Sequence, residues 1–82
     1  MTYTDAVNEN LDRLLRISDL PLWRVAADCG IHPSALSKYR SGDRALSKKH
    51  ADVLAQFFDV TPAQVAGEAE IPYEKLVRVR EV

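Results

Sequence analysis

The sequence predicts an all-α fold, and two kinds of observation favour that class. First, apolar residues recur at helical spacing, with four of them at i, i+3, i+4 and i+7 in one stretch: Leu22, Val25, Ala26 and Cys29. Second, prolines stand where such stretches begin and glycines where they end, as is typical of helix boundaries. A chain of 82 residues has room for one domain. We therefore expect five helices and a short C-terminal extension.

The first predicted helix runs from about Thr4 to Ser18. Thr4 is its expected N-cap, because a threonine hydroxyl can accept a hydrogen bond from a free N–H of the first turn. Four apolar residues at helical spacing form the side that faces the core: Val7, Leu11, Leu14 and Leu15.

The pattern of residues 20–42 predicts two short helices joined by a tight turn at Gly30. Pro21 is expected at the first position of the first helix, because the N–H that it lacks would have no partner there. Gly30 is expected to end that helix, because the residue after a helix often needs a positive φ. The second helix is predicted over Pro33 to Ser41, with His32 as its N-cap.

The second of these helices has two unlike sides when its residues are placed at about 100° per step. One side is mainly apolar and comprises Leu36, Tyr39, Ala35 and His32. The other side is small and polar and comprises Pro33, Ser34, Ser37, Lys38 and Ser41. Because nothing bulky stands on the polar side, the helix can approach another molecule closely, and its shape suits the major groove of DNA.

This stretch resembles the helix-turn-helix of the phage Cro and repressor proteins and of the wider xenobiotic-response-element type of bacterial regulators. Eight residues match the family pattern in order and spacing: Leu20, Val25, Ala26, Gly30, Ile31, Leu36, Ser37 and Gly42. The resemblance covers about two-thirds of the chain, from Leu11 to Val65, and implies a five-helix repressor-like DNA-binding domain.

Three positions depart from the family pattern. Pro21 stands where the family usually has Ser or Thr, Leu22 where it has Gln, and Arg40 where it has Glu. Leu22 cannot make the phosphate contact of a glutamine side chain. The charge at Arg40 is reversed, so we expect this arginine to pair with Asp12 or Asp19.

Charge is distributed unevenly along the chain. The net charge is −1, but residues 33–50 contain five Lys or Arg residues and one Asp. Such a basic segment is either a solvated lysine-rich face or the electrostatic footprint of a DNA site. Because it coincides with the second helix of the motif, we favour the DNA site.

The resemblance implies a set of contacts to double-stranded DNA. Base contacts are expected from Pro33, Ser34, Ser37 and Lys38, and phosphate contacts from Ser41, Arg44, Lys48 and Lys49, while His32 is a cap or a groove contact. Lys38 is the one residue of this face that can strongly prefer the O6 and N7 acceptors of guanine.

Two further helices are predicted after the basic loop. The fourth runs from about Lys48 to Asp59, is capped by Ser47, and turns Ala51, Leu54, Ala55 and Phe58 inward. Val53 and Phe57 point away from this core, so either the C-terminal segment or another subunit must cover them. The fifth helix is brief and begins with a capping box formed by Thr61, the N-cap, and Gln64. Pro62 is its first helical residue, Val65 faces the core, and Gly67 ends it.

We expect residues 1–67 to form the DNA-binding domain and residues 68–82 to be an extension used for dimerisation. Residues 77–82 are β-prone and partly alternate, whereas the spacing after Pro72 also suits a helix. We favour a short strand that pairs with its copy in a homodimer. The expected interface residues are Val53, Phe57, Val77 and Val79.

Two single residues allow more than one interpretation. Trp23 lies at the border of the apolar face, so it either edges the core or contacts a second subunit. Cys29 is the only cysteine and cannot form an internal disulfide. For this cysteine we favour a small buried side chain over a redox sensor.

The sequence lacks the features of several other classes. It has no metal-ligand cluster, glycine-rich phosphate loop or nucleophile motif, so we expect no catalysis, metal, cofactor or small-molecule ligand. No apolar run approaches the ~18 residues of a membrane helix, and no export signal is evident, so we expect a cytoplasmic protein.

Together these features predict a small sequence-specific DNA-binding transcriptional regulator of the phage or bacterial repressor type. The alternative is a protein-binding module, such as an antitoxin or an adaptor, that keeps the helix-turn-helix as a scaffold. In that case Trp23, Val53 and Phe57 would dock the partner.

Overall fold

The structure, a computed structural model, describes residues 8–81. Within this range it contains six helices and no strand, which confirms the all-α prediction and adds one helix to the five expected. The helices are α1 Glu9–Ser18, α2 Leu22–Cys29, α3 Pro33–Ser41, α4 Lys48–Phe58, α5 Pro62–Val65 and α6 Tyr73–Glu81.

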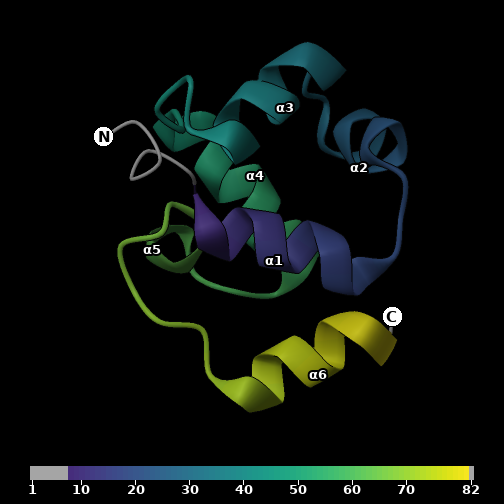
Figure 1. Ribbon diagram of the computed structural model, residues 1–82, viewed down its shortest axis with the longest axis vertical. Helices are drawn as coiled ribbons and strands as arrows, with labels where there is room; N and C mark the ends of the chain where they lie inside the picture. The colour runs from purple at the N-terminus through teal and green to yellow at the C-terminus, as the bar shows by residue number, and fades with distance from the viewer. Residues whose placement is uncertain (1–7, 82) are drawn as a thin grey trace.

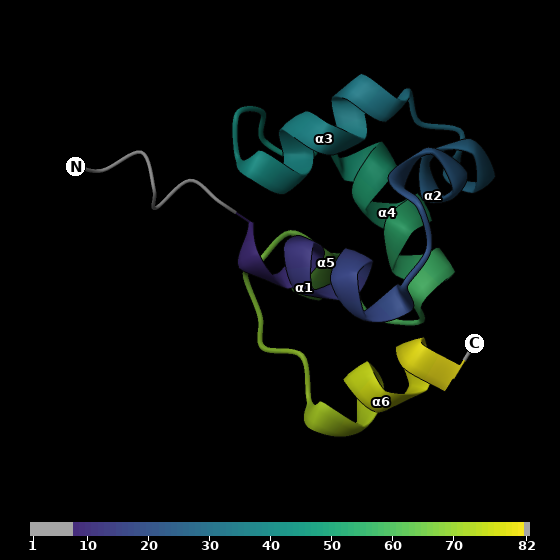
Figure 2. The same ribbon diagram turned by 45° about the vertical axis from the view of Figure 1, so that its right-hand side comes forward.

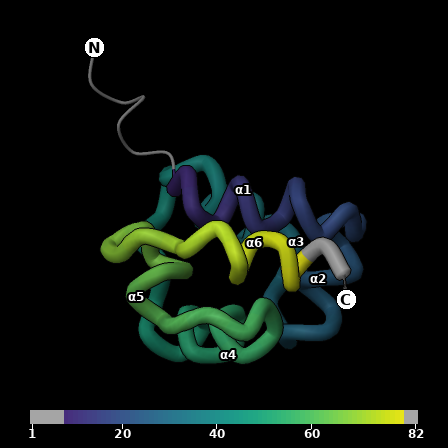
Figure 3. The backbone as a smooth tube through the Cα atoms, turned by 90° about the horizontal axis from the view of Figure 1, so that it is seen from below, coloured from purple at the N-terminus to yellow at the C-terminus, as the bar shows by residue number. Residues whose placement is uncertain are grey.

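The central helix of the fold is α1, which packs against α3, α5 and α6. Figure 1 shows α2 and α3 above α1 and α6 below it, and the turned view in Figure 2 keeps this order. In Figure 3, seen from the side of α6, that helix runs alongside α1. The recognition helix of the predicted motif, α3, therefore lies at the opposite end of the molecule from α6.

The core lies between α1 and the helices around it. Because a chain this short buries a smaller share of its surface than a longer one does, each fully covered side chain matters to stability. The largest side chains with no exposed surface are Leu11, Leu14, Leu36, Leu54, Val25 and Val65.

The first helix begins later than predicted, at Glu9. Asn8 is its N-cap, and the Asn8 Oδ1 accepts a hydrogen bond from the Leu11 N–H at 3.1 Å. The Asn8 side-chain amide also donates to the Val65 carbonyl at 2.9 Å, so one residue caps α1 and holds α5 against it. The expected cap Thr4 and the expected core residue Val7 lie outside the described residues.

The motif helices have the boundaries that the sequence predicts, with one adjustment. Pro21 is the N-cap of α2 and not its first helical residue. Gly30 ends α2 in the left-handed conformation, at a φ of 68°. His32 caps α3, because its Nδ1 accepts from the Ser34 N–H at 3.1 Å.

The caps and the inner faces of α4 and α5 also confirm the predictions. The Ser47 Oγ accepts from the His50 N–H at 3.3 Å, and Thr61 and Gln64 form the capping box of α5. The inner face of α4 is buried and consists of Ala51, Leu54, Ala55 and Phe58.

The prediction of a dimerisation strand near the C-terminus is wrong, because residues 73–81 form α6. Val79 is buried in its own chain at 6% exposure, so it is not available as an interface residue in this conformation. Ile71, just before the helix, is also buried, and the Lys75 Nζ donates to the Asp59 carbonyl at 3.0 Å. Packing against α1 therefore outweighs the β-propensity of the valines.

None of the helices that the structure describes combines the length and the apolar character needed to cross a membrane.

Candidate nucleic-acid interface

The two sides of α3 differ in burial as the helical spacing predicts. Leu36 and Tyr39 are 0% and 4% exposed and face the core, and Ala35 is half-buried. His32, which was expected on the inner side, is exposed instead, because its ring caps the helix from outside. The polar side is open to solvent over all five of its residues: Pro33, Ser34, Ser37, Lys38 and Ser41.

The C-terminal half of α3 is fixed to α1 by an ion pair. The Arg40 Nε donates to the Asp12 Oδ1 at 2.6 Å, so Asp12 and not Asp19 is the partner of this arginine. Asp12 also pairs with Arg16 at 3.1 Å, and the Asn8 N–H donates to the Arg40 carbonyl at 3.3 Å. The arginine that departs from the family pattern therefore orients the exposed helix.

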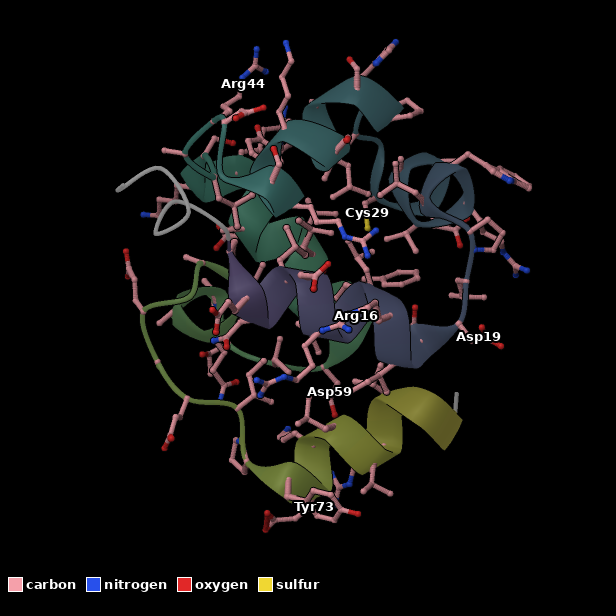
Figure 4. The ribbon with its side chains drawn as sticks, in the orientation of Figure 1. Arg16, Asp19, Cys29, Arg44, Asp59 and Tyr73 are labelled. Atoms are coloured by element: carbon pink, nitrogen blue, oxygen red, sulfur yellow. The ribbon has the colours of Figure 1, made fainter. Side chains whose placement is uncertain are left out.

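The loop after α3 folds back onto the end of that helix. The Arg44 N–H donates to the Lys38 carbonyl at 3.3 Å, and the Ser41 Oγ accepts from the Asp43 N–H at 3.4 Å. Gly42 allows this reversal with a φ of 86°. Figure 4 shows Arg44 beside α3, at the end of the molecule farthest from Tyr73.

Most cations of this end lie outside the ion pairs that the described part of the chain forms. The ion pairs there involve Arg16, Arg24, Arg40 and Lys75. Four cations are exposed and lie outside these pairs: Lys38, Arg44, Lys48 and Lys49. A solvated surface of this kind is free to attract an anion.

Two of these cations lie where the helix itself disfavours them. Lys48 and Lys49 stand in the first turn of α4, at the positive end of the helix dipole. The same end offers backbone N–H groups that can bind a phosphate. Stability of the free protein does not explain this placement, whereas contact with a polyanion does.

A contact that sequence analysis missed links α3 to α4. The Tyr39 hydroxyl and the His50 Nδ1 are 2.7 Å apart, and the two rings meet edge to face with centroids 5.6 Å apart. Helical spacing places Tyr39 on the mainly apolar side of α3 and gives His50 no partner on another helix. The spacing of 11 residues along the chain gives no sign that these side chains meet.

Comparison with known proteins gives a family. The Helix-turn-helix family model matches residues 24–65, just over half of the chain, from the first turn of α2 to the end of α5. The chain belongs to the helix-turn-helix family. No curated protein and no solved structure matches it. Domains of this kind bind DNA through the second helix of the motif, which makes this chain a DNA-binding regulator.

In this helix-turn-helix protein the second motif helix is α3. The match therefore includes the exposed side of α3, the cationic loop and the start of α4. It leaves out the whole of α1, which carries Asp12, and the whole of α6. Among the described residues no group of His, Cys, Asp and Glu could hold a metal ion.

The cysteine of the helix-turn-helix protein is a core residue. Cys29 is 7% exposed, and burial, together with the charge of Asp28, raises the pKa of its thiol to about 11. Since the thiolate is the reactive form, this thiol is unreactive near neutral pH.

The apolar residues expected at a subunit interface fall into two groups. Val53 and Phe57 are half-buried and pack against the core, and Phe57 also contacts Phe58 edge to face. A pocket of about 370 Å³ lies where α6 approaches the ends of α1 and α4, lined by Ser18, Leu20, Phe57, Phe58, Asp59, Lys75, Arg78 and Val79. Val77 points away from the core and is 37% exposed.

Proposed function

We propose that this protein binds double-stranded DNA sequence-specifically as a small transcriptional regulator of the repressor type. The proposal depends on one observation above all. A nine-residue helix exposes a side of small polar residues and one lysine, and the following loop and first turn of α4 carry cations that lie outside the ion pairs of residues 8–79. The helix is narrow enough to enter the major groove on that side.

The proposed contacts divide into two kinds. Base edges are contacted by Pro33, Ser34, Ser37 and Lys38, with His32 at the groove, and phosphates by Ser41, Arg44, Lys48 and Lys49. Serine hydroxyls both donate and accept, so they discriminate weakly between bases. Specificity therefore depends on Lys38, on DNA shape and on the repetition of half-sites in a dimer.

The end of the molecule that carries α6 is the proposed contact with a second copy. Tyr73 and Val77 stand one helical turn apart and are 79% and 37% exposed. Half-buried Val53 and Phe57 extend the apolar surface on α4. Because α6 and α3 lie at opposite ends (Figure 1), a contact through α6 does not cover α3.

Sedimentation velocity tests the dimer. The wild-type chain is expected to sediment as a dimer, and Val77→Glu as a monomer. Ala69→Glu adds the same charge at an exposed loop position and is the matched control. A wild-type monomer at all concentrations, or a Val77→Glu variant that stays dimeric, would refute this interface.

Salt-dependent binding tests the DNA contact. Fluorescence anisotropy with a labelled duplex pool measures the association constant as a function of salt. Three phosphate-binding cations predict a slope of log K on log salt near −3 per protomer, because each releases about 0.9 counterions. Replacing Arg44, Lys48 and Lys49 by glutamine should abolish most of this slope. Failure of the wild type to bind duplex DNA at low salt would reject the proposal.

The exposed Trp23 favours one alternative. At 64% exposure this ring offers a large apolar contact that the monomer does not use. In a protein-binding module, such as an antitoxin or an adaptor, it would dock the partner. Complete indifference to DNA would favour that function.

A further inference from the structure

We propose that His50 is a phosphate ligand in the DNA complex, held by Tyr39 in the tautomer that carries its proton on Nε2. The inference rests on the proposed function and adds a neutral contact to the cationic ones. Three features of the described residues lead to it: the partner of Nδ1, the exposure of Nε2 and the position of the ring on α4.

The hydroxyl of Tyr39 determines the tautomer. Tyr39 is 4% exposed, and its hydroxyl has the His50 Nδ1, at 2.7 Å, as its only partner in the described part of the chain. If the histidine donated from Nδ1, the tyrosine hydrogen would be left without an acceptor in a buried place, which is costly. The hydroxyl therefore donates to Nδ1, and the proton of the neutral ring is on Nε2.

The Nε2 atom is open to solvent. Among residues 8–79 the Nε2 atom has no hydrogen-bond partner. Because every buried side-chain nitrogen and oxygen in that range does have a partner, Nε2 cannot be one of the buried atoms. His50 itself is half-buried, so one edge of the ring meets Tyr39 and the other reaches the surface. The ring thus offers a fixed N–H donor to an outside acceptor.

The position of His50 indicates which acceptor that is. The residue stands in the first turn of α4, directly after Lys48 and Lys49, and its own backbone N–H is capped by Ser47. An acceptor drawn to this turn by the lysines is an anion, and in the proposed complex it is a backbone phosphate.

The contact would join backbone recognition to base recognition. A phosphate bound by His50 is linked through the Tyr39 hydroxyl to α3, the helix proposed to read the bases. Phosphate contacts fix the register of a protein on the duplex. His50 is therefore expected to set how α3 sits in the groove, a role that a flexible lysine performs poorly.

The experiment compares His50→Ala, Tyr39→Phe and the double variant on one duplex, under conditions in which circular dichroism shows all of them folded. His50→Ala should weaken binding about tenfold to a hundredfold, the range for one hydrogen bond to a charged group. Its salt slope should equal that of the wild type, because a neutral donor releases no counterion. Lys48→Ala, the control, should reduce the slope by about 0.9. Tyr39→Phe should weaken DNA binding when it is introduced into the wild-type protein. It should have no further effect on binding when it is introduced into the His50→Ala variant.

A duplex series with single methylphosphonates locates the contact. At one position, neutralising the phosphate should remove the difference between the wild type and His50→Ala. If His50→Ala binds as tightly as the wild type while Lys48→Ala binds less tightly, the inference fails and the proposed function stands. If the wild type binds no duplex, both fail.

The ring nitrogens can be examined in the free wild-type protein, so the inference does not depend on folded variants. Nitrogen-15 chemical shifts distinguish the two neutral tautomers. A proton on Nε2 supports the inference, and a proton on Nδ1 overturns it.

Discussion

The ion pair between Arg40 and Asp12 should measurably stabilise the fold, because it is short and partly covered. Its atoms are 2.6 Å apart and its side chains are 35% and 27% exposed. The pair between Arg24 and Asp28 is a suitable control, at 3.8 Å with side chains 57% and 49% exposed. Exposed pairs contribute about 0.2–1 kcal/mol. We therefore expect a coupling free energy of about 1 kcal/mol for the first pair and less than about 0.3 kcal/mol for the second.

A double-mutant cycle measures this coupling. Arg40→Met keeps the aliphatic stem and removes the charge, and Asp12→Asn keeps the shape of the carboxylate. Urea unfolding followed by circular dichroism gives the free energy of unfolding of each variant. In a domain of this size, 1 kcal/mol corresponds to about 4–8 °C in melting temperature. A coupling no larger than that of the control cycle would refute the role of Arg40 in holding α3 to α1.

Three further predictions concern core, titration and specificity. Leu36→Ala should lower the free energy of unfolding by about 2–5 kcal/mol, because this side chain is fully buried, whereas exposed Ser37→Ala should stay within about 0.5 kcal/mol; equal effects would contradict the orientation of α3. The pKa of Cys29 is raised from 9.0 to about 11, so its contribution to stability is full below pH 9 and is lost as the pH rises to about 11. Cys29→Ala should therefore lose less stability than the wild type over this window, and parallel pH profiles of urea unfolding would contradict the burial of the thiol. Lys38→Ala should cost about 1–3 kcal/mol of discrimination at one base pair per half-site, whereas Lys48→Ala should weaken binding evenly on every sequence. Anisotropy on a panel of single-substitution duplexes separates the two, and equal losses from both variants on all duplexes would disprove the division of roles.

The starts of α3 to α5 and the end of α2 were predictable because local chemistry determines them, whereas α5 ends at Val65, before the predicted Gly67. Gly30 supplies a positive φ, and Ser47 and Thr61 accept hydrogen bonds from N–H groups three residues ahead. Each of these signals lies within a few residues of the boundary that it determines.

The ends of the fold were not predictable, because contacts distant in sequence decide them. Thr4 and Asn8 are both suitable caps by type, but Asn8 caps α1 while its amide donates to the Val65 carbonyl, 57 residues away. The valines of α6 suit a strand by propensity. The burial of Val79 on the core selects the helix.

The same limit applies to the candidate site. Helical spacing predicted which side of α3 is exposed, because burial of Leu36 and Tyr39 fixes the rotation of the helix. It left the partner of Arg40 open between two aspartates. It also gave no indication that Tyr39 meets His50, since that contact depends on how α3 crosses α4.

Selection of bound duplexes from a random pool tests the central claim most directly. We predict that the wild-type protein enriches a recurring sequence with two-fold symmetry, and that Lys38→Ala relaxes one position in each half of it. A folded wild-type protein that enriches no sequence would contradict sequence-specific binding by the exposed side of α3.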